Sequence, residues 1–243
     1  GRSTPCSPAG LMRAVALIPA KSVSRRLPGK NLKPLAGMPL FLHSVHAAME
    51  SGVFDAVYVS SDAEEILLLA ENAGAIPLAR PHILCDDTVT NFQVLRHHMA
   101  RWRGANQNID VMALLQPTTP FRTPQPLVAM LERLVADAEA DSLVTVARAS
   151  RLCGVIERGY WRPAGLAQAR ARKIQANQVL YEITGHVVML RPTQTLDKGS
   201  LLGNRILSDP LPTEWPDIDI DNPEDWRMAE AYAKFMASPC GTG

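Results

Sequence analysis

The sequence predicts an α/β fold in which a mostly parallel sheet carries helices on both faces. Short apolar runs alternate with helix-like patterns from residue 14 to residue 147. The runs at 14–18 and 111–115 are continuously apolar, which is typical of strands buried on both faces. A helix between successive strands is the usual connection in a parallel sheet. In such sheets, ligands bind at the carboxyl ends of the strands.

Turn and capping signals define the individual elements in order. Pro39 is expected to open the first helix and Gly52 to end it, whereas Asp62 is expected to cap the second. We predict strands at 14–18, 56–60, 76–78, 111–115 and 143–147, and helices at 39–51, 62–72, 90–102, 124–137 and 223–235.

The alternation ends after residue 148. Strand-like patterns at 153–157 and 179–191 flank an irregular, arginine-rich stretch, so we expect residues 150–190 to leave the sheet as a dimerisation hairpin. The chain is expected to form a single domain over residues 13–237, with flexible tails at 1–12 and 238–243.

Composition excludes several classes of protein. The chain has 243 residues and a formal net charge of +1, which does not favour nucleic acid as a partner. No apolar run approaches the roughly 20 residues that a membrane helix needs. The four cysteines are scattered and contain no CxxC pair, so we expect free thiols and a cytoplasmic location rather than a zinc site.

The first candidate binding segment is a basic loop, residues 18–31, that follows the first strand. A Pro-Gly pair forces a turn in it, and the loop differs from a Walker A motif. Cations and exposed backbone N–H groups at a strand end suit a triphosphate. Its cations are Lys21, Arg25, Arg26 and Lys30, and its hydroxyls are those of Ser22 and Ser24.

The second candidate is an acidic stretch, residues 217–221, before the last helix. Its three aspartates alternate with isoleucines, so an extended chain places their carboxylates on one face. Mg²⁺ is usually bound by one or two carboxylates together with substrate phosphates. Asp219 and Asp221 are therefore candidate Mg²⁺ ligands, although an acidic edge strand would show the same pattern.

Two further loops carry polar side chains at predicted strand ends. In residues 114–122, Gln116 and Thr118 follow a buried strand and lie in a loop that prolines make rigid. In residues 78–88, Arg80 is positioned to meet a base carbonyl or a phosphate, and Asp87 and Thr88 to order the loop.

Taken together, these stretches resemble the CMP-sialic acid synthetase family (acylneuraminate cytidylyltransferases). That family shows I-P-A-R, L-P-x-K-N, V-S-T/S-D, R-P…D-T, L-L-Q-P-T-S-P-x-R and D-I-D in this order. The counterparts here lie at residues 18–31, 59–62, 80–88, 114–122 and 219–221, with similar order and spacing.

The resemblance implies a Rossmann-like, GT-A-like nucleotidyltransferase fold, a homodimer, and CTP with a 2-keto-3-deoxy acidic sugar as substrates. It implies that Lys21, Ser24, Arg25, Lys30 and Asn31 hold CTP, that Arg80, Asn91 and Gln116 line the nucleotide or sugar pocket, and that Asp219 and Asp221 bind Mg²⁺.

The acceptor half departs further from the family. The family's N-G-A-I-Y strand is replaced here by Thr184-Gly185-His186 and two valines, and its R-Q-x-x-P stretch begins with Ile174. Lys21 stands where the family usually has arginine, which keeps the charge and loses the bidentate fork. The acceptor-side candidates are Arg151, Arg172, Gln175 and Tyr181, and Ser22 and Thr118 are further candidate substrate contacts.

The expected reaction is transfer of CMP from CTP to an acidic sugar of the sialic acid (nonulosonate) class, with release of pyrophosphate. The catalytic candidates are Lys21, Arg25, Asp219 and Asp221. The alternatives are transfer to a KDO-type octulosonate or a phosphonate acid, a sugar-nucleotide-dependent glycosyltransferase, and a non-catalytic nucleotide-binding module.

Overall fold

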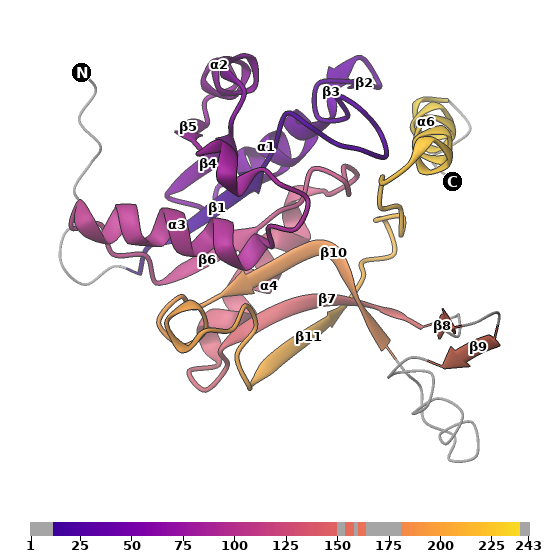
Figure 1. The fold of residues 1–243 in the computed structure, drawn as a ribbon. Coiled ribbons are helices and arrows are strands. Elements are labelled where there is room, and N and C mark those ends of the chain that lie inside the picture. Colours follow the sequence, from indigo (N-terminus) through magenta and orange to yellow (C-terminus); the bar gives the residue numbers. More distant parts are fainter. Residues whose placement is uncertain (1–11, 150–153, 158–159, 164–180, 239–243) are drawn as a thin grey trace.

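The computed structural model describes residues 12–149, 154–157, 160–163 and 181–238. Its main sheet has seven strands in the order β11-β7-β10-β6-β1-β4-β5 (Figure 1). All neighbouring pairs are parallel except those of β10, which runs antiparallel to β6 and β7. The predicted mostly parallel α/β fold is confirmed.

The predicted elements correspond closely to observed ones. The strands of the main sheet are β1 (Ala14–Pro19), β4 (Ala56–Ser61), β5 (Ile76–Ala79), β6 (Val111–Leu114), β7 (Ser142–Arg148), β10 (Tyr181–Leu190) and β11 (Ile206–Pro210). The helices are α1 (Leu40–Ser51), α2 (Glu64–Asn72), α3 (Asn91–Gly104), α4 (Pro124–Ala136) and α6 (Pro223–Ala237), with short 3-10 turns η1 (His82–Leu84) and η3 (Leu196–Lys198).

One predicted helix cap is wrong, and three short strands were not predicted. Asp62 does not cap α2, whose N-cap is Ala63, because the Asp62 carboxylate accepts hydrogen bonds from the backbone and hydroxyl of Ser22. The sequence analysis also missed β11, an edge strand, and the short pair β2 (Pro34–Leu35) and β3 (Met38–Pro39). These strands are short or largely exposed, so they lack the apolar runs that identify buried strands.

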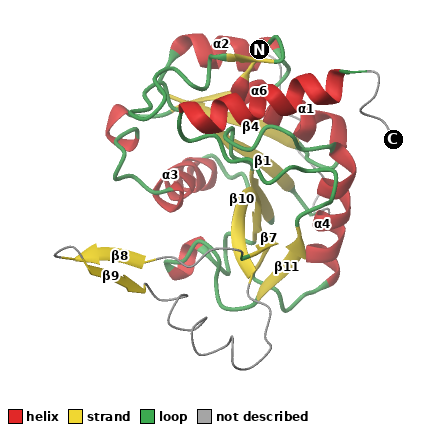
Figure 2. Ribbon diagram, turned by 90° about the vertical axis from the view of Figure 1, so that its right-hand side faces the viewer, coloured by secondary structure: helices red, strands yellow, loops and turns green. Residues whose placement is uncertain are grey.

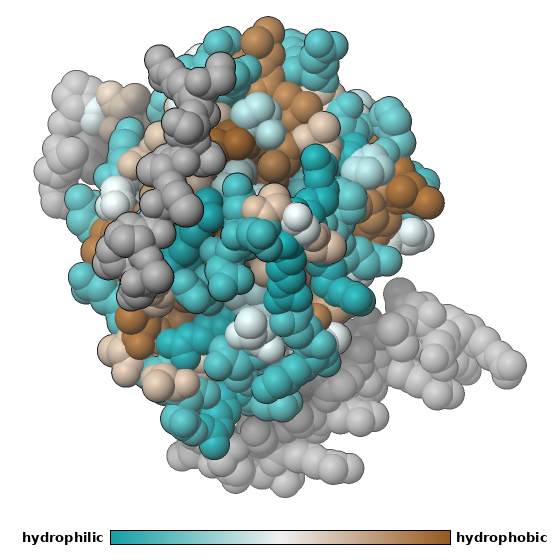
Figure 3. Space-filling view, turned by 90° about the vertical axis from the view of Figure 1, so that its left-hand side faces the viewer, coloured by the Kyte–Doolittle hydropathy of each residue, from teal (hydrophilic) through white to brown (hydrophobic). Residues whose placement is uncertain are grey.

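Helices cover both faces of the sheet, as Figures 1 and 2 show. On one face, Val45 of α1, Ile66 of α2 and Leu127 of α4 belong to the larger apolar cluster. On the other face, Leu95 and Met99 of α3 belong to the second cluster. The molecular surface on the α3 side is mostly hydrophilic, with separate hydrophobic patches (Figure 3).

A third, smaller core joins the two ends of the described chain. Leu27 and Leu40 from the N-terminal part pack with Ile220 and Trp226 from the C-terminal part. The backbone N–H of Ile220 also donates to the carbonyl oxygen of Thr118, at 2.8 Å. This packing brings the acidic stretch to the carboxyl edge of the sheet, beside the basic loop.

Strand β10 is irregular where it passes this edge. Its pairing with β7 shifts register between Ile183 and Val188. Thr184 fills the interruption, because its hydroxyl lies 2.6 Å from that of Thr145. The next two residues, Gly185 and His186, therefore meet the site in an orientation that a regular strand would not give.

Strands β8 (Gly154–Glu157) and β9 (Tyr160–Pro163) form a separate antiparallel pair away from the main sheet (Figures 1 and 2). They lie within the segment predicted to leave the sheet. That prediction is wrong for residues 181–190, because β10 pairs with β6 and β7 inside the main sheet. No helix among the described residues is both long and apolar enough to cross a membrane.

Candidate active site

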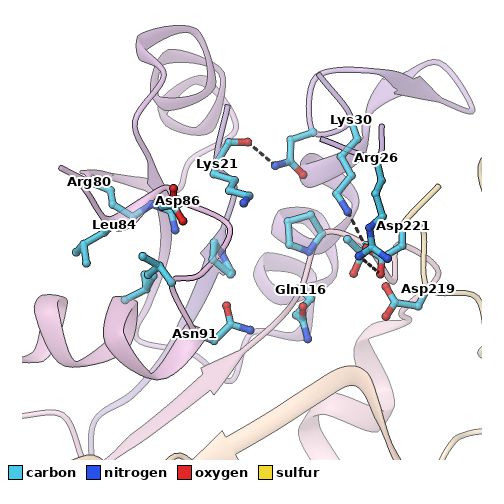
Figure 4. A pocket seen from close by; sticks show the side chains of 16 residues that line it. Lys21, Arg26, Lys30, Arg80, Leu84, Asp86, Asn91, Gln116, Asp219 and Asp221 are labelled. Carbon is cyan, nitrogen blue, oxygen red and sulfur yellow. Dashed lines mark hydrogen bonds and ion pairs between the residues drawn. The ribbon is translucent and has the colours of Figure 1, made fainter. Parts of the chain in front are cut away.

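A cleft of about 320 Å³ lies at the carboxyl ends of β1, β5 and β6. In Figure 4, Lys21 and Arg80 stand on one side, Asp219 and Asp221 on the other, and Asn91 and Gln116 between them. The cleft is lined by Pro19, Lys21, Arg26, Lys30, Asn31, Arg80, Leu84, Asp86, Val89, Asn91, Val94, Gln116, Pro117, Thr118, Asp219 and Asp221.

The N-terminal end of the basic loop is tied to the segment after β5. Asp87 forms ion pairs with both Lys21 and Arg25, the latter at 2.8 Å. The hydrogen bond from Lys21 lowers the pKa of the Asp87 carboxyl below its usual value. Asp87 thus occupies two of the cations that a triphosphate would use.

The C-terminal end of the same loop is tied to the acidic stretch. Lys30 Nζ donates to the carbonyl oxygen of Ile220 at 2.9 Å and lies 3.2 Å from an oxygen of Asp221. Arg26 pairs with the other oxygen of Asp221 at 2.7 Å. The Lys30 side chain is 13% exposed and that of Arg26 is 67% exposed, so solvent screens Lys30 much less.

Two buried polar side chains in the lining have atoms without a protein partner. Arg80 is 6% exposed, and its Nε and Nη2 make no hydrogen bond. Asn31 is 5% exposed; its Nδ2 donates to the carbonyl oxygen of Lys21, but its Oδ1 accepts nothing. An unsatisfied buried polar group costs about 1–3 kcal/mol, so these atoms mark positions where a ligand would complete the hydrogen bonding.

The carboxylate pair lies across the cleft from Lys21 and Arg80. Asp219 is accessible from the cleft, but nearby protein atoms partly desolvate its carboxyl group, which raises its pKa. A hydrogen bond with Thr118 lowers this pKa, and the negative charge of Asp221 raises it. A desolvated carboxylate beside a second one is stabilised by a cation.

Arg122 supports the loop that carries Gln116 and Thr118. This buried guanidinium donates to the carbonyl oxygen of Gln116 at 2.6 Å, to the hydroxyl of Ser44 at 2.6 Å, and to the side chain of Thr119. Burial lowers the pKa of Arg122 to about 9, against the nearby negative charge of Asp219, so the group stays charged at neutral pH. The sequence analysis had noted Arg122 only as part of a motif.

The structure brings together nine of the sequence-predicted site residues in one cleft: Lys21, Lys30, Asn31, Arg80, Asn91, Gln116, Thr118, Asp219 and Asp221. Ser22, Ser24, Arg25 and Tyr181 do not line it; Ser22 binds Asp62, Arg25 pairs with Asp87, and Tyr181 is exposed on β10. Arg151, Arg172 and Gln175 lie outside the described residues. Among the lining residues that sequence reasoning left out are Leu84, Val89 and Val94, apolar positions without a chemical signature.

A parallel sheet with cations and carboxylates facing each other at its carboxyl edge is the arrangement of a nucleotide-binding transferase. The profile of the family described as "Cytidylyltransferase" matches residues 15–159. The chain belongs to this cytidylyltransferase family.

Relatives with assigned activities include CMP-N,N'-diacetyllegionaminic acid synthase of Legionella pneumophila, which is 30% identical over 90% of this chain and 95% of its own length. N-acylneuraminate cytidylyltransferase of Escherichia coli is 31% identical over 59% of this chain, and only 33% of its own length is covered. Pseudaminic acid cytidylyltransferase of Campylobacter jejuni is 34% identical over 51% of this chain and 54% of its own length.

Solved structures agree on the fold. A CMP:2-keto-3-deoxy-manno-octonic acid synthetase complexed with CTP superimposes with a TM-score of 0.70 over 91% of this chain and 98% of its own, at 17% identity. A 4-diphosphocytidyl-2C-methyl-D-erythritol synthase from Anaerococcus prevotii gives a TM-score of 0.60 over 92% of this chain and 99% of its own, at 11% identity.

Proposed function

We propose that this protein transfers CMP from CTP to an acidic sugar of the nonulosonate class and releases pyrophosphate. The observation that carries the proposal is the cleft itself, in which loop cations face the Asp219–Asp221 pair and the buried Arg80 and Asn31 keep unpartnered polar atoms. The names of the relatives, which act on legionaminic, neuraminic and pseudaminic acids, support the class of acceptor.

The two ends of the cleft have different roles in the proposed reaction. Arg80, Asn31 and Asn91 orient the nucleoside, because the free hydrogen-bonding atoms of Arg80 and Asn31 and the amide of Asn91 suit a base and a ribose. Lys21 and Lys30 stabilise the charge that develops on the departing pyrophosphate. Gln116 and Thr118 contact the acceptor side, so that its oxygen is held in line with the α-phosphorus.

The donor set at Asp219 and Asp221 fits Mg²⁺. One or two carboxylates together with substrate phosphates and waters are the usual environment of this ion, and both aspartates line the cleft. When bound, Mg²⁺ would polarise the α-phosphate and lower the pKa of the attacking hydroxyl. Asp221 must first exchange its pairing with Arg26 and Lys30.

The remaining roles belong to the same proposal. The part of the 150–190 segment that precedes β10 forms a dimer contact that brings Arg151, Arg172 and Gln175 near the acceptor, beside Tyr181 at the start of β10; the separation of β8 and β9 from the sheet supports this. Arg25 and Ser24 contact the triphosphate once Asp87 is displaced. Residues 13–237 act as one catalytic domain, and the protein works in the cytoplasm, where CTP is available and a free thiol such as that of Cys85 is stable.

The test measures CTP-dependent pyrophosphate release with Mg²⁺ and a panel of acids: N-acetylneuraminic, N,N'-diacetyllegionaminic, pseudaminic and 2-keto-3-deoxy-manno-octonic acid. We expect release with at least one of the first three and identification of the CMP-sugar by mass spectrometry. Pyrophosphate release with the octonic acid alone would show that the acceptor is an octulosonate and not a nonulosonate. Release with none of the acids would overturn the proposal. Light scattering tests the dimer separately.

A further inference from the structure

His186 is a buried histidine on the irregular part of β10, at a position where the related family motif has alanine. It is 1% exposed, and its Nε2 lies 3.1 Å from the carbonyl oxygen of Pro216. A carbonyl oxygen only accepts, so Nε2 carries the proton and donates it. Burial and the charge of Arg122 lower the pKa of His186 to about 4, so the ring is neutral in the physiological range.

The partners of His186 belong to the segment that leads into the acidic stretch. Its ring stacks on Trp215, with centroids 6.0 Å apart and an interplanar angle of 17°. Trp215 is 2% exposed, and its Nε1 donates to the hydroxyl of Thr123 at 2.9 Å. Pro216 also accepts from the backbone N–H of Ile218 at 2.8 Å, which starts the turn into Asp219.

Gly185, which precedes His186, has no side chain and lies next to the Asp219 carboxylate. A Cβ atom on Gly185 would lie 3.4 Å from Oδ2 of Asp219 and 3.2 Å from Nε2 of Gln116. Thus β10 contacts the acidic stretch at two consecutive residues. Gly185 lies against the Asp219 side chain, and His186 holds the backbone three residues before it.

We propose that His186 is a positioning residue, which fixes Asp219 as a metal ligand through its hydrogen bond to Pro216 and its stacking on Trp215. This inference rests on the proposed function. His186 does not touch substrate, because its ring is buried and its donor is engaged with protein. Residues that orient metal ligands typically change metal affinity or activity 10- to 100-fold when replaced.

The test separates the donor of His186 from its ring. His186→Phe keeps an aromatic ring against Trp215 but removes the donor, whereas His186→Gln places an amide N–H near the position of Nε2. Mn²⁺ binding is measured by electron paramagnetic resonance of the free ion, in the presence of a non-hydrolysable CTP analogue. We expect His186→Phe to weaken Mn²⁺ binding about tenfold and His186→Gln to stay within about threefold of the original chain.

His98 provides a matched control. It is also 1% exposed, and its ring lies near that of a tryptophan, Trp102. Its Nε2 forms a hydrogen bond with the Ser60 hydroxyl, at 2.8 Å. It lies on α3, its neighbour Trp102 belongs to the other apolar cluster, and neither residue lines the cleft. We expect His98→Gln to lower the melting temperature without changing the Mn²⁺ affinity.

Three outcomes would overturn the proposal: unchanged Mn²⁺ affinity in His186→Phe, equal losses in the Phe and Gln variants, or an equal loss in His98→Gln. If His186→Phe does not fold, Trp215→Phe, which loses the bond to Thr123, is expected to weaken Mn²⁺ binding severalfold, and an unchanged affinity there contradicts the proposal. Failure of the proposed function looks different, since the original chain would then neither bind Mn²⁺ with the CTP analogue nor release pyrophosphate.

Discussion

The two walls of the cleft are built in opposite ways. The phosphate wall consists of long cationic side chains on a loop (Lys21, Arg26 and Lys30), and the side chain of Arg26 is 67% exposed. The metal wall consists of short carboxylates on a segment held by buried neighbours: Ile220 bonded to Thr118, and Trp215 stacked on His186.

In the proposed function, one wall binds phosphates and the other binds a metal ion, which accounts for the difference. Charge attraction between a cation and a phosphate falls slowly with distance, so flexible side chains are adequate. Metal coordination is sensitive to changes of a few tenths of an ångström in the metal–ligand distance, so the ligands need a rigid backbone. We therefore expect substitutions on the metal wall to have large effects and those on the exposed part of the phosphate wall small ones.

The largest effect is expected for Asp219→Asn. Loss of the carboxylate should reduce kcat by about 1,000-fold or more, since metal stabilisation of transition-state charge is worth several kcal/mol. Pyrophosphate release at saturating CTP measures it. A decrease of less than about tenfold would remove Asp219 from the metal site.

The same variant is expected to be more stable without metal. The pKa of Asp219 is raised, so the folded chain binds this proton more tightly than the unfolded chain does. At neutral pH the charged form therefore destabilises the fold, and stability from this group increases as pH falls through the raised pKa. Thermal unfolding in the presence of a chelator should give Asp219→Asn a higher melting temperature at pH 7, and an advantage that shrinks as pH falls.

Next in size is the contrast between Lys30 and Arg26, which pair with the same carboxylate. Lys30→Ala should lower kcat/KM about 100-fold, a loss typical of a pre-organised charge at the reacting centre. Arg26→Ala should lower it only severalfold, because its side chain is mostly exposed and screened. Equal losses of kcat/KM in the two variants would show that the burial of a cation does not determine how much it contributes to catalysis.

A smaller effect is expected from pH. Metal binding requires the charged form of Asp219, so kcat/KM should rise with pH through the raised pKa and level off above it. The acidic limb of the profile should lie above the usual aspartate value of about 3.9. An acidic limb at or below that value would show that desolvation does not raise the pKa of Asp219.

The smallest effect is expected for Asp87→Asn. Asp87 competes with the triphosphate for Lys21 and Arg25, and exposed ion pairs are weak, so removing the charge should lower KM for CTP by at most about fivefold. The gain should disappear in high salt. A raised KM at low salt would instead show that Asp87 orders the loop for binding.

The residues that line the cleft were easier to predict from the sequence than the buried residues that hold them in place. Strands such as β1 and β6 were predictable because continuous apolar runs specify burial. Asp219 was predictable because alternating carboxylates share one face of an extended chain, and Lys30 because it belongs to a basic loop that follows a strand. Trp215 and His186 were not, since their roles depend on contacts between residues 29 positions apart or more. Asp62 was misassigned for the same reason: its hydrogen bonds go to Ser22, 40 residues away, rather than to the adjacent helix.

The Lys30–Asp221 contact joins residues 191 positions apart in the chain. During synthesis, which adds about 5–20 residues per second, the phosphate wall emerges roughly 10–40 s before the metal wall. A nascent chain that already exposes residues 18–31 therefore still lacks the carboxylates that would activate a phosphate. In the proposed reaction, the chain therefore becomes able to turn over nucleotide only after residues 217–221 have packed beside the basic loop.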